Sequence, residues 1–173
     1  MLRVRSFRHA DSNADQLTLR QIEDIAKKQF PLATKFEINK LFDRLQNHAP
    51  GTFAPVIFVV EDFEGKVNAF ASVLLYPPLK LAHLEFISVS PGNTRGGMGG
   101  MLYERVRDEC KSLGYKAVLF ECLPDEPGPS RDEKTMKENR QRLRFYEQFG
   151  ARPLLNTGTN NHLHQKVKSV RSW

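Results

Sequence analysis

Hydrophobic and polar residues follow two different periods along the chain, and the two periods separate expected strands from expected helices. Residues 2–8 alternate with the two-residue period of a strand, and residues 55–60 are almost continuously apolar, as in a buried strand. Segments 66–76 and 79–89 have the same character and follow short turns, one of which contains Gly65. Consecutive strands joined by short turns predict an antiparallel meander.

Amphipathic helices are expected where apolar residues return every three or four positions. Residues 15–29 and 35–47 show this spacing between the first two expected strands. Two further helices are expected over residues 98–113 and 139–149, each followed by a glycine, Gly114 and Gly150. Segment 123–138 contains three prolines and mixed charge, so it is expected to be a surface loop.

The order of these elements predicts a mixed sheet of the α+β (mixed α/β) class. Short strands are expected over residues 116–122 and 151–156. A strand, loop, helix and strand in succession predict a right-handed crossover. Antiparallel strands one to four would then precede a parallel pair of strands four and five, with helices on both faces. We expect one domain over residues 1–156 and a basic C-terminal tail over 157–173, which holds only a faint last strand near 163–170.

Composition indicates a folded protein rather than a disordered or membrane-spanning one. Hydrophobic residues make up 40% of the 173 residues, which is enough for one core. No apolar run approaches the roughly 20 residues of a membrane-spanning helix, and the first residues lack a signal-peptide pattern. The two cysteines, Cys110 and Cys122, are expected to be reduced and buried. We therefore expect a cytoplasmic protein that binds neither a metal nor a membrane.

The formal net charge of +6 is concentrated at the C-terminal end. Residues 1–138 contain 19 Lys or Arg and 19 Asp or Glu, whereas residues 139–173 contain seven basic residues against Glu147 alone. The basic end is either a solvated tail or a patch for a polyanion, such as nucleic acid or a phosphate-bearing cofactor. Nucleic acid is not the expected partner, because few aromatic residues are interleaved with the basic ones.

Residues 90–100 form a glycine-rich loop at the start of an expected helix. Four of its last five residues are glycine: Gly96, Gly97, Gly99 and Gly100. Amide groups at a helix start bind phosphate oxygens, and glycine lets the backbone reach such a ligand. A nucleoside-triphosphate loop would need Lys and then Ser or Thr after its last glycine, and a dinucleotide fingerprint would need glycine in place of Leu102. Neither motif is present.

Two stretches match a known pattern. Thr94-Arg95-Gly96-Gly97-Met98-Gly99 occupies the frame Arg/Gln-x-x-Gly-x-Gly/Ala, with Thr94 in the first position and the cation moved to Arg95. In residues 139–151, Asn139 stands seven residues before Tyr146. Glu, Gly and Ala follow Tyr146 at the expected places, while Arg142 replaces a small residue. Over residues 3–156 the chain resembles the GNAT superfamily of acyl-CoA-dependent N-acyltransferases.

The resemblance implies transfer of an acetyl group from acetyl-CoA to a primary amine, by direct attack in a ternary complex. It implies a general acid at Tyr146, and contacts to CoA from Ile87, Ser88, Val89, Thr94, Arg95, Gly96, Gly97, Met98, Gly99, Gly100 and Asn139. The acceptor amine (small molecule, peptide or protein lysine) stays open, as does a homodimer. The alternative is a non-catalytic acyl-CoA-binding module that lacks a working base.

The general base is sought on the strand over residues 79–89. An alkylammonium with a pKa of about 10.4 needs a proton acceptor before it can attack. Strict alternation places His83 and Glu85 on the same face as Ile87 and Val89. Polar residues on an otherwise apolar strand need a reason. We expect Glu85 as the base, ahead of His83; the alternative is that one or both only hydrogen-bond a neighbour or form an ion pair.

Overall fold

The structure is a computed structural model that describes residues 2–30, 39–40, 43–45, 53–92, 96–122, 132–154 and 168–172. The chain divides into two compact units, Met1–Lys116 and Ala117–Trp173, which are treated separately below. The boundary expected between residues 156 and 157 lies outside the described residues.

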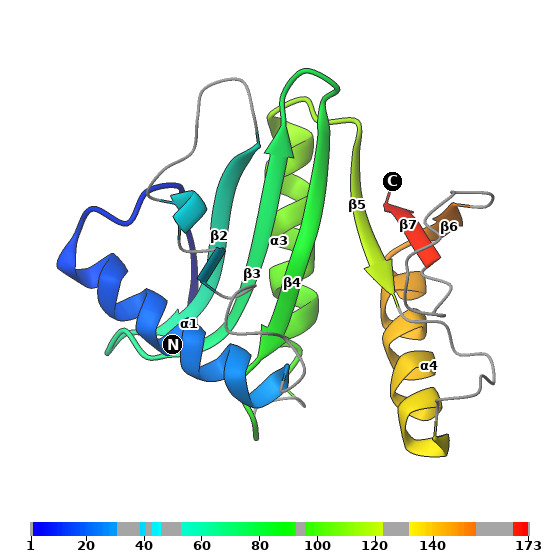
Figure 1. Cartoon of the computed structure of the whole chain (residues 1–173), viewed down its shortest axis with the longest axis horizontal. Coiled ribbons are helices and arrows are strands. Elements are labelled where there is room, and N and C mark those ends of the chain that lie inside the picture. The colour runs from blue at the N-terminus through cyan, green and yellow to red at the C-terminus, as the bar shows by residue number, and fades with distance from the viewer. Residues whose placement is uncertain are drawn as a thin grey trace. The chain divides into compact units, whose positions relative to one another are not determined.

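The first unit contains a four-stranded antiparallel sheet (Figure 1). Its strands are β1 (Leu2–Phe7), β2 (Ala54–Asp62), β3 (Val67–Tyr76) and β4 (Leu81–Val89). β2 pairs with both β1 and β3, and β3 pairs with β4. The meander predicted from short turns is therefore confirmed. Seven of the nine residues in β2 and nine of the ten in β3 are buried, which explains why both strands are nearly continuous apolar runs.

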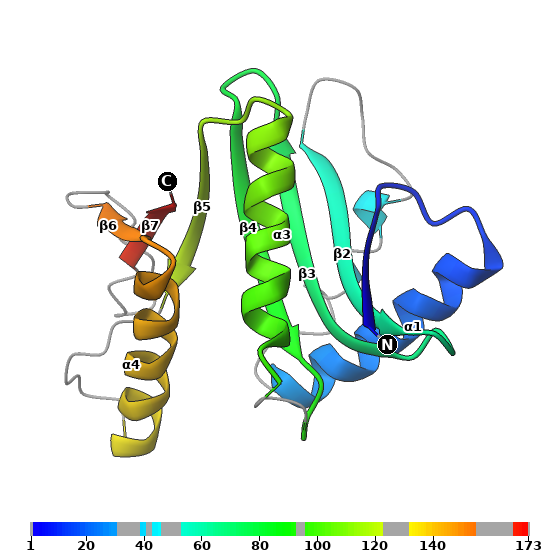
Figure 2. The same cartoon turned by 180° about the vertical axis from the view of Figure 1, so that it is seen from behind.

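Helices cover both faces of this sheet, as predicted. α1 (Asn13–Gln29) crosses one face and α3 (Met98–Ser112) the other, which a comparison of Figures 1 and 2 makes clear. Ser12 caps α1, because its side chain accepts a hydrogen bond from the Asp15 amide. The apolar stripe of α1 packs on alternate residues of β2 in one cluster, which includes Ile22, Ile25, Ile57 and Val59.

The helix expected over residues 35–47 falls mostly outside the described residues. Residues 39–40 and 43–45 are helical. Leu45 is 1% exposed and belongs to the cluster between α1 and the sheet. This short segment therefore lies on the same face of the sheet as α1.

The second unit contains β5 (Ala117–Cys122), α4 (Glu133–Gln148), β6 (Arg152–Leu154) and β7 (Lys168–Ser172). β7 pairs antiparallel with β5 on one side and with β6 on the other. The faint last strand expected in the basic tail is thus a strand, placed at residues 168–172. It supplies the antiparallel partner that β6, only three residues long, needs.

α4 begins earlier than predicted, so the expectation of a loop over residues 123–138 was wrong for its last six residues. Asp132 is the N-cap, and its side chain accepts a hydrogen bond of 2.7 Å from the Thr135 amide. Glu133 adds a carboxylate to the first turn, where the helix dipole favours negative charge. All three prolines of the segment precede Asp132, so they do not interrupt the helix.

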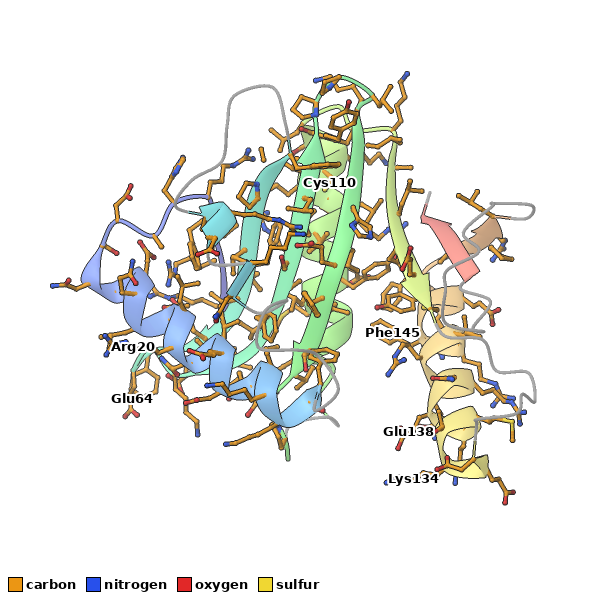
Figure 3. All side chains as sticks on the ribbon, in the orientation of Figure 1. Arg20, Glu64, Cys110, Lys134, Glu138 and Phe145 are labelled. Carbon is orange, nitrogen blue, oxygen red and sulfur yellow. The ribbon has the colours of Figure 1, made fainter. Side chains whose placement is uncertain are left out.

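Both cysteines are free and buried, Cys110 on α3 (Figure 3) and Cys122 at the end of β5. Burial raises the pKa of the Cys110 thiol to about 12 and that of Cys122 to about 11. The expectation of reduced, buried cysteines is confirmed. Among the described residues, no helix combines the length and the apolar character needed to cross a membrane.

We expect neither thiol to react with a disulfide reagent in the native protein at pH 8. At pH 8 only about one Cys110 thiol in ten thousand and one Cys122 thiol in a thousand would be ionised, and only the thiolate is nucleophilic. The measurement is the absorbance of released thionitrobenzoate with and without denaturant. Denatured protein should release two equivalents because the chain has two cysteines. Rapid release from native protein would show that the thiols are accessible.

Candidate functional site

The start of α3 exposes backbone amides. Gly97 is its N-cap residue and has a φ of +68°, in the left-handed region that favours glycine. The first helical hydrogen bond runs from the Met101 amide to the Gly97 carbonyl, at 3.0 Å. The amides of residues 97–100 thus precede the helical ladder and have no acceptor within the helix. Gly96 and Gly97 are exposed, so this end of the helix is open to a ligand.

Among the described residues, the start of α3 has neither a side-chain cap nor an acidic residue in its first turn, unlike the starts of α1 and α4. Ser12 and Asp132 cap those two helices with side-chain oxygens, and each of the two helices has a carboxylate in its first turn. α3 has a glycine at its N-cap and no acidic residue in its first turn. The positive end of its dipole is therefore left for an external anion. Of the residues predicted to contact phosphate, Thr94 and Arg95 lie outside the described residues.

A β-bulge interrupts the pairing of β4 with β3. Leu84 pairs with Val73 and Phe86 pairs with the adjacent Ser72, so Glu85 has no β3 partner. One inserted residue shifts the side-chain alternation by one position. The bulge therefore changes which residues of β4 share a face of the sheet.

His83 and Glu85 lie on the face that α1 covers, while Ile87 and Val89 lie on the face that α3 covers. His83 pairs with Leu74, which lies two positions from Ser72 and so on the same face of β3. Glu85 contacts Ser72 directly. Ile87 and Val89 pair instead with Ala71 and Ala69, which face the other way. The expectation that these four residues share one face was wrong. Strict alternation does not anticipate an extra residue in one strand.

Both carboxylate oxygens of Glu85 have partners. Oε1 forms an ion pair with Nη1 of Arg44, and Oε2 accepts a hydrogen bond of 3.1 Å from the Ser72 hydroxyl. The Glu85 side chain is 14% exposed and the Arg44 side chain 31%, so solvent reaches the pair. This is the ion pair that the sequence left open as an alternative to a general base.

Arg44 and Ser72 were missed by sequence reasoning. Ser72 is fully buried on the central strand β3, among apolar residues, and that contrast is a signal that the sequence contains. Arg44 carries no comparable signal, since an arginine on an amphipathic helix is ordinarily solvated. Its pairing depends on how a segment 41 positions away packs on the sheet.

The other predicted residues of β4 lie close to the end of the strand. Ser88 is buried and pairs with Phe70, and Phe86 contacts the ring of Phe30 edge to face, at 5.4 Å between centroids. The Val89 carbonyl accepts a hydrogen bond of 2.9 Å from the Gln29 side chain. These contacts hold the end of β4 against the end of α1.

In the second unit, Asn139 and Tyr146 lie on one buried face of α4, two helical turns apart. They are 2% and 6% exposed. The Tyr146 ring packs on Phe120 of β5 at 4.1 Å and on Phe145 at 5.1 Å between centroids. Arg142, which stands where the family pattern has a small residue, donates a hydrogen bond of 3.5 Å to the Asn139 side chain. The two residues thus share a face of α4, as their seven-residue spacing requires.

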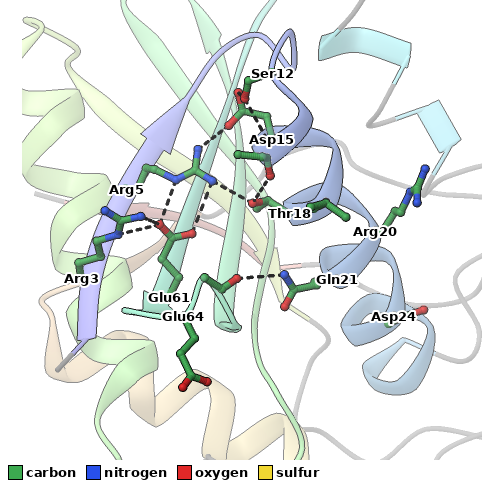
Figure 4. Close-up of a pocket in the computed structure, with 13 residues that line it drawn as sticks. Arg3, Arg5, Ser12, Asp15, Thr18, Arg20, Gln21, Asp24, Glu61 and Glu64 are labelled. Carbon is green, nitrogen blue, oxygen red and sulfur yellow. Dashed lines mark hydrogen bonds and ion pairs between the residues drawn. The ribbon is translucent and has the colours of Figure 1, made fainter.

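A separate cavity of about 580 Å³, lined by several charged side chains, lies between α1 and the β1–β2 edge of the sheet (Figure 4). Its base is Glu61, whose side chain is 2% exposed and contacts Arg3 at 2.7 Å and Arg5 at 3.2 Å. Arg5 also contacts Asp15 at 2.5 Å and donates a hydrogen bond of 2.9 Å to Thr18. Each buried charge in this network has an opposite charge beside it. The network therefore ties β1, β2 and α1 together.

Replacing Arg5 with methionine is expected to lower the free energy of unfolding by about 1–3 kcal/mol, because Glu61 would keep only the exposed Arg3 as a partner. The matched control is Arg20→Met, since Arg20 is an exposed arginine that lines the same cavity (Figures 3 and 4). Urea unfolding curves give both values. Equal losses in the two variants would contradict the role of the network.

Asp15 makes part of the stability dependent on pH. Burial acts to raise the pKa of Asp15, but hydrogen bonds from Ser12 and Arg5 and the charge of Arg5 outweigh burial, so the net pKa is lowered. A lowered pKa in the folded state stabilises the fold above the unfolded value of about 3.9, and this contribution is lost as pH falls through the folded value. When the pH is lowered below 4, the free energy of unfolding of Asp15→Asn, measured with urea, should therefore fall less than that of the wild type. Parallel pH profiles would contradict this.

Two of the three comparisons with known proteins found matches, and both point to the same family. The acetyltransferase (GNAT) family model matches residues 19–151, whereas no curated protein sequence matches significantly. Three solved structures illustrate the likeness. Ribosomal-protein-S18-alanine N-acetyltransferase from Escherichia coli is 20% identical, with a TM-score of 0.64 and coverage of 99% of this chain and 91% of that chain.

The spermidine N-acetyltransferase SpeG chimera from Vibrio cholerae and hSSAT is 18% identical, with a TM-score of 0.66 and coverage of 99% and 94%. The catalytic domain of Tetrahymena GCN5 histone acetyltransferase, in complex with coenzyme A, is 11% identical, with a TM-score of 0.67 and coverage of 100% and 93%. These likenesses confirm the mixed α/β fold. The family match spans most of the chain and includes β4, the glycine start of α3 and the α4 motif, and it shows that this chain is an acetyltransferase of the GNAT family.

Proposed function

We propose that the chain transfers an acetyl group from acetyl-CoA to a primary amine, by direct attack of the amine in a ternary complex. One observation carries this proposal: the uncapped, glycine-rich start of α3, with no acidic residue in its first turn. Its place within the matched region of the family supports a diphosphate as its ligand. The amides of residues 97–100 would bind the phosphate oxygens of CoA.

Other residues would hold the remainder of the co-substrate. Backbone groups of Ile87, Ser88 and Val89 would bind the pantetheine arm, and one amide would polarise the thioester oxygen. The side chain of Asn139 would add a contact to the co-substrate. The side chains of Thr94 and Arg95 would complete the diphosphate site.

The reaction forms a nitrogen–carbon bond and breaks the carbon–sulfur bond of the thioester. Glu85 would accept a proton from the amine, directly or through a water molecule, and Tyr146 would give a proton to the departing thiolate. The Glu85 side chain is 14% exposed, and this partial contact with solvent supports the first role. His83, on the same face of β4, is the second candidate base.

Two measurements test the proposal. Titration calorimetry with coenzyme A tests the site at α3, and detection of released thiol with a panel of primary amines tests transfer. The buried cysteines keep the background of the thiol assay low. We expect CoA binding in the wild type and in Tyr146→Phe, with slower transfer in the variant. Binding without transfer to any amine would favour a non-catalytic acyl-CoA-binding module, and no binding would overturn the proposal.

The acceptor does not follow from the structural neighbours. By name, those neighbours act on an alanine of ribosomal protein S18, on spermidine and on histones. One fold therefore serves acceptors of very different charge and size. The acceptor class has to be inferred from the residues of this chain.

A further inference from the structure

The ion pair between Arg44 and Glu85 places a fixed cation beside the proposed base. Arg44 belongs to the helical segment 43–45, and Glu85 is the unpaired residue of the β4 bulge. The hydroxyl of Ser72, on the buried strand β3, donates a hydrogen bond to the second carboxylate oxygen. Glu85 is thus oriented by two partners, one fixed within the sheet and one reachable from solvent.

An acceptor amine enters as an ammonium ion, and the Glu85 carboxylate is the group that attracts it. Arg44 already contacts this carboxylate, and its side chain is the more exposed of the two, at 31% against 14%. A purely cationic acceptor would displace the guanidinium or approach beside it, which leaves two cations sharing one carboxylate. Like charges at such a distance repel, and a guanidinium separated from its partner needs a new anion.

An acceptor with both an ammonium and a carboxylate removes this conflict. Its ammonium pairs with Glu85, and its carboxylate accepts two parallel hydrogen bonds from the planar guanidinium of Arg44. The Arg44–Glu85 ion pair can then separate, because each of its two charges gains an opposite charge of the acceptor. Because Arg44 and Glu85 are in direct contact, the two charges of the acceptor must also lie close together, a few bonds apart.

We propose that Arg44 is a specificity-determining residue that binds the carboxylate of a zwitterionic acceptor, so that the substrate class is a small amino acid or a related amino-carboxylate. This inference rests on the proposed acetyl transfer to a primary amine. It commits to the chemistry of the acceptor, which the family match leaves open.

The test compares amino acids with acceptors that lack only the negative charge. Each ω-amino carboxylate, over several chain lengths, is paired with its primary amide, and kcat/KM for thiol release is measured with acetyl-CoA. The enzymes are the wild type, Arg44→Gln, Arg44→Lys and the control Arg20→Gln, which removes an exposed arginine on α1. Coenzyme A binding and thermal unfolding of each variant show that it is folded.

We expect the wild type and Arg20→Gln to prefer the carboxylate by about tenfold or more at the best chain length, as for a charge-assisted pair. In Arg44→Gln the ratio of kcat/KM for the carboxylate to kcat/KM for the amide should fall towards one, chiefly through a change in KM. Arg44→Lys should keep part of the preference, because a point charge replaces the bidentate guanidinium.

Three outcomes overturn the inference. A wild type that acetylates amines without regard to the carboxylate overturns it and leaves the proposed transfer intact. An unchanged ratio in folded Arg44→Gln shows that another residue selects the carboxylate. A wild type that binds coenzyme A but acetylates no amine of either kind overturns the proposed transfer, and the inference with it.

Discussion

Replacing Glu85 with glutamine is expected to lower kcat for acetyl transfer by about 10²–10⁴-fold, the usual contribution of a positioned proton acceptor. The amide keeps the shape of the side chain and can still accept the hydrogen bond from Ser72. It cannot take a proton from the amine, and it leaves Arg44 without its carboxylate. The measurement is the initial rate of thiol release at saturating acetyl-CoA and amine, across the pH range.

His83→Gln is the matched control for this prediction. His83 lies on the same face of β4, two residues away, and pairs with Leu74 across the sheet. If Glu85 is the base, the loss in the His83 variant should be the smaller one. A Glu85→Gln enzyme that keeps most of its activity, while His83→Gln loses it, would exchange the two roles. Coenzyme A binding should be unchanged in both, because neither residue lies at the start of α3.

Replacing Gly99 with aspartate is expected to weaken coenzyme A binding by about 100-fold or more while leaving the fold at least as stable. Gly99 is the second residue of α3, where a carboxylate interacts favourably with the helix dipole by about 0.3–1 kcal/mol. The same carboxylate repels a diphosphate by several kcal/mol at a separation of about 4 Å. Titration calorimetry and thermal unfolding measure the two effects independently.

Gly99→Asn separates charge from size in this experiment. Asparagine has nearly the shape of aspartate but carries no charge, so most of the affinity should remain. Equal losses in the two variants would mean that a side chain of either kind blocks the site. Full affinity in Gly99→Asp would place the diphosphate elsewhere and contradict the assignment of the α3 start as the diphosphate site, on which the proposed function depends.

The amino-acid sequence by itself determined the features that arise from local patterns. The antiparallel run of β2, β3 and β4 follows from apolar segments joined by short turns. The open start of α3 follows from four glycines in five residues, and the shared face of Asn139 and Tyr146 follows from their spacing along one helix. In each case the residues that specify the structure are neighbours in the chain, so their period is readable without the fold.

Only the tertiary structure decided which groups surround the proposed base. The bulge at Glu85 arises from the register between two strands, whereas strict alternation placed His83 and Glu85 on the same face as Ile87 and Val89. The ion pair with Arg44 depends on a helical segment packing on the sheet from 41 positions away. Register and long-range packing are set by many weak contacts between residues that are distant in the chain. The periodicity of the sequence does not predict the combined effect of those contacts.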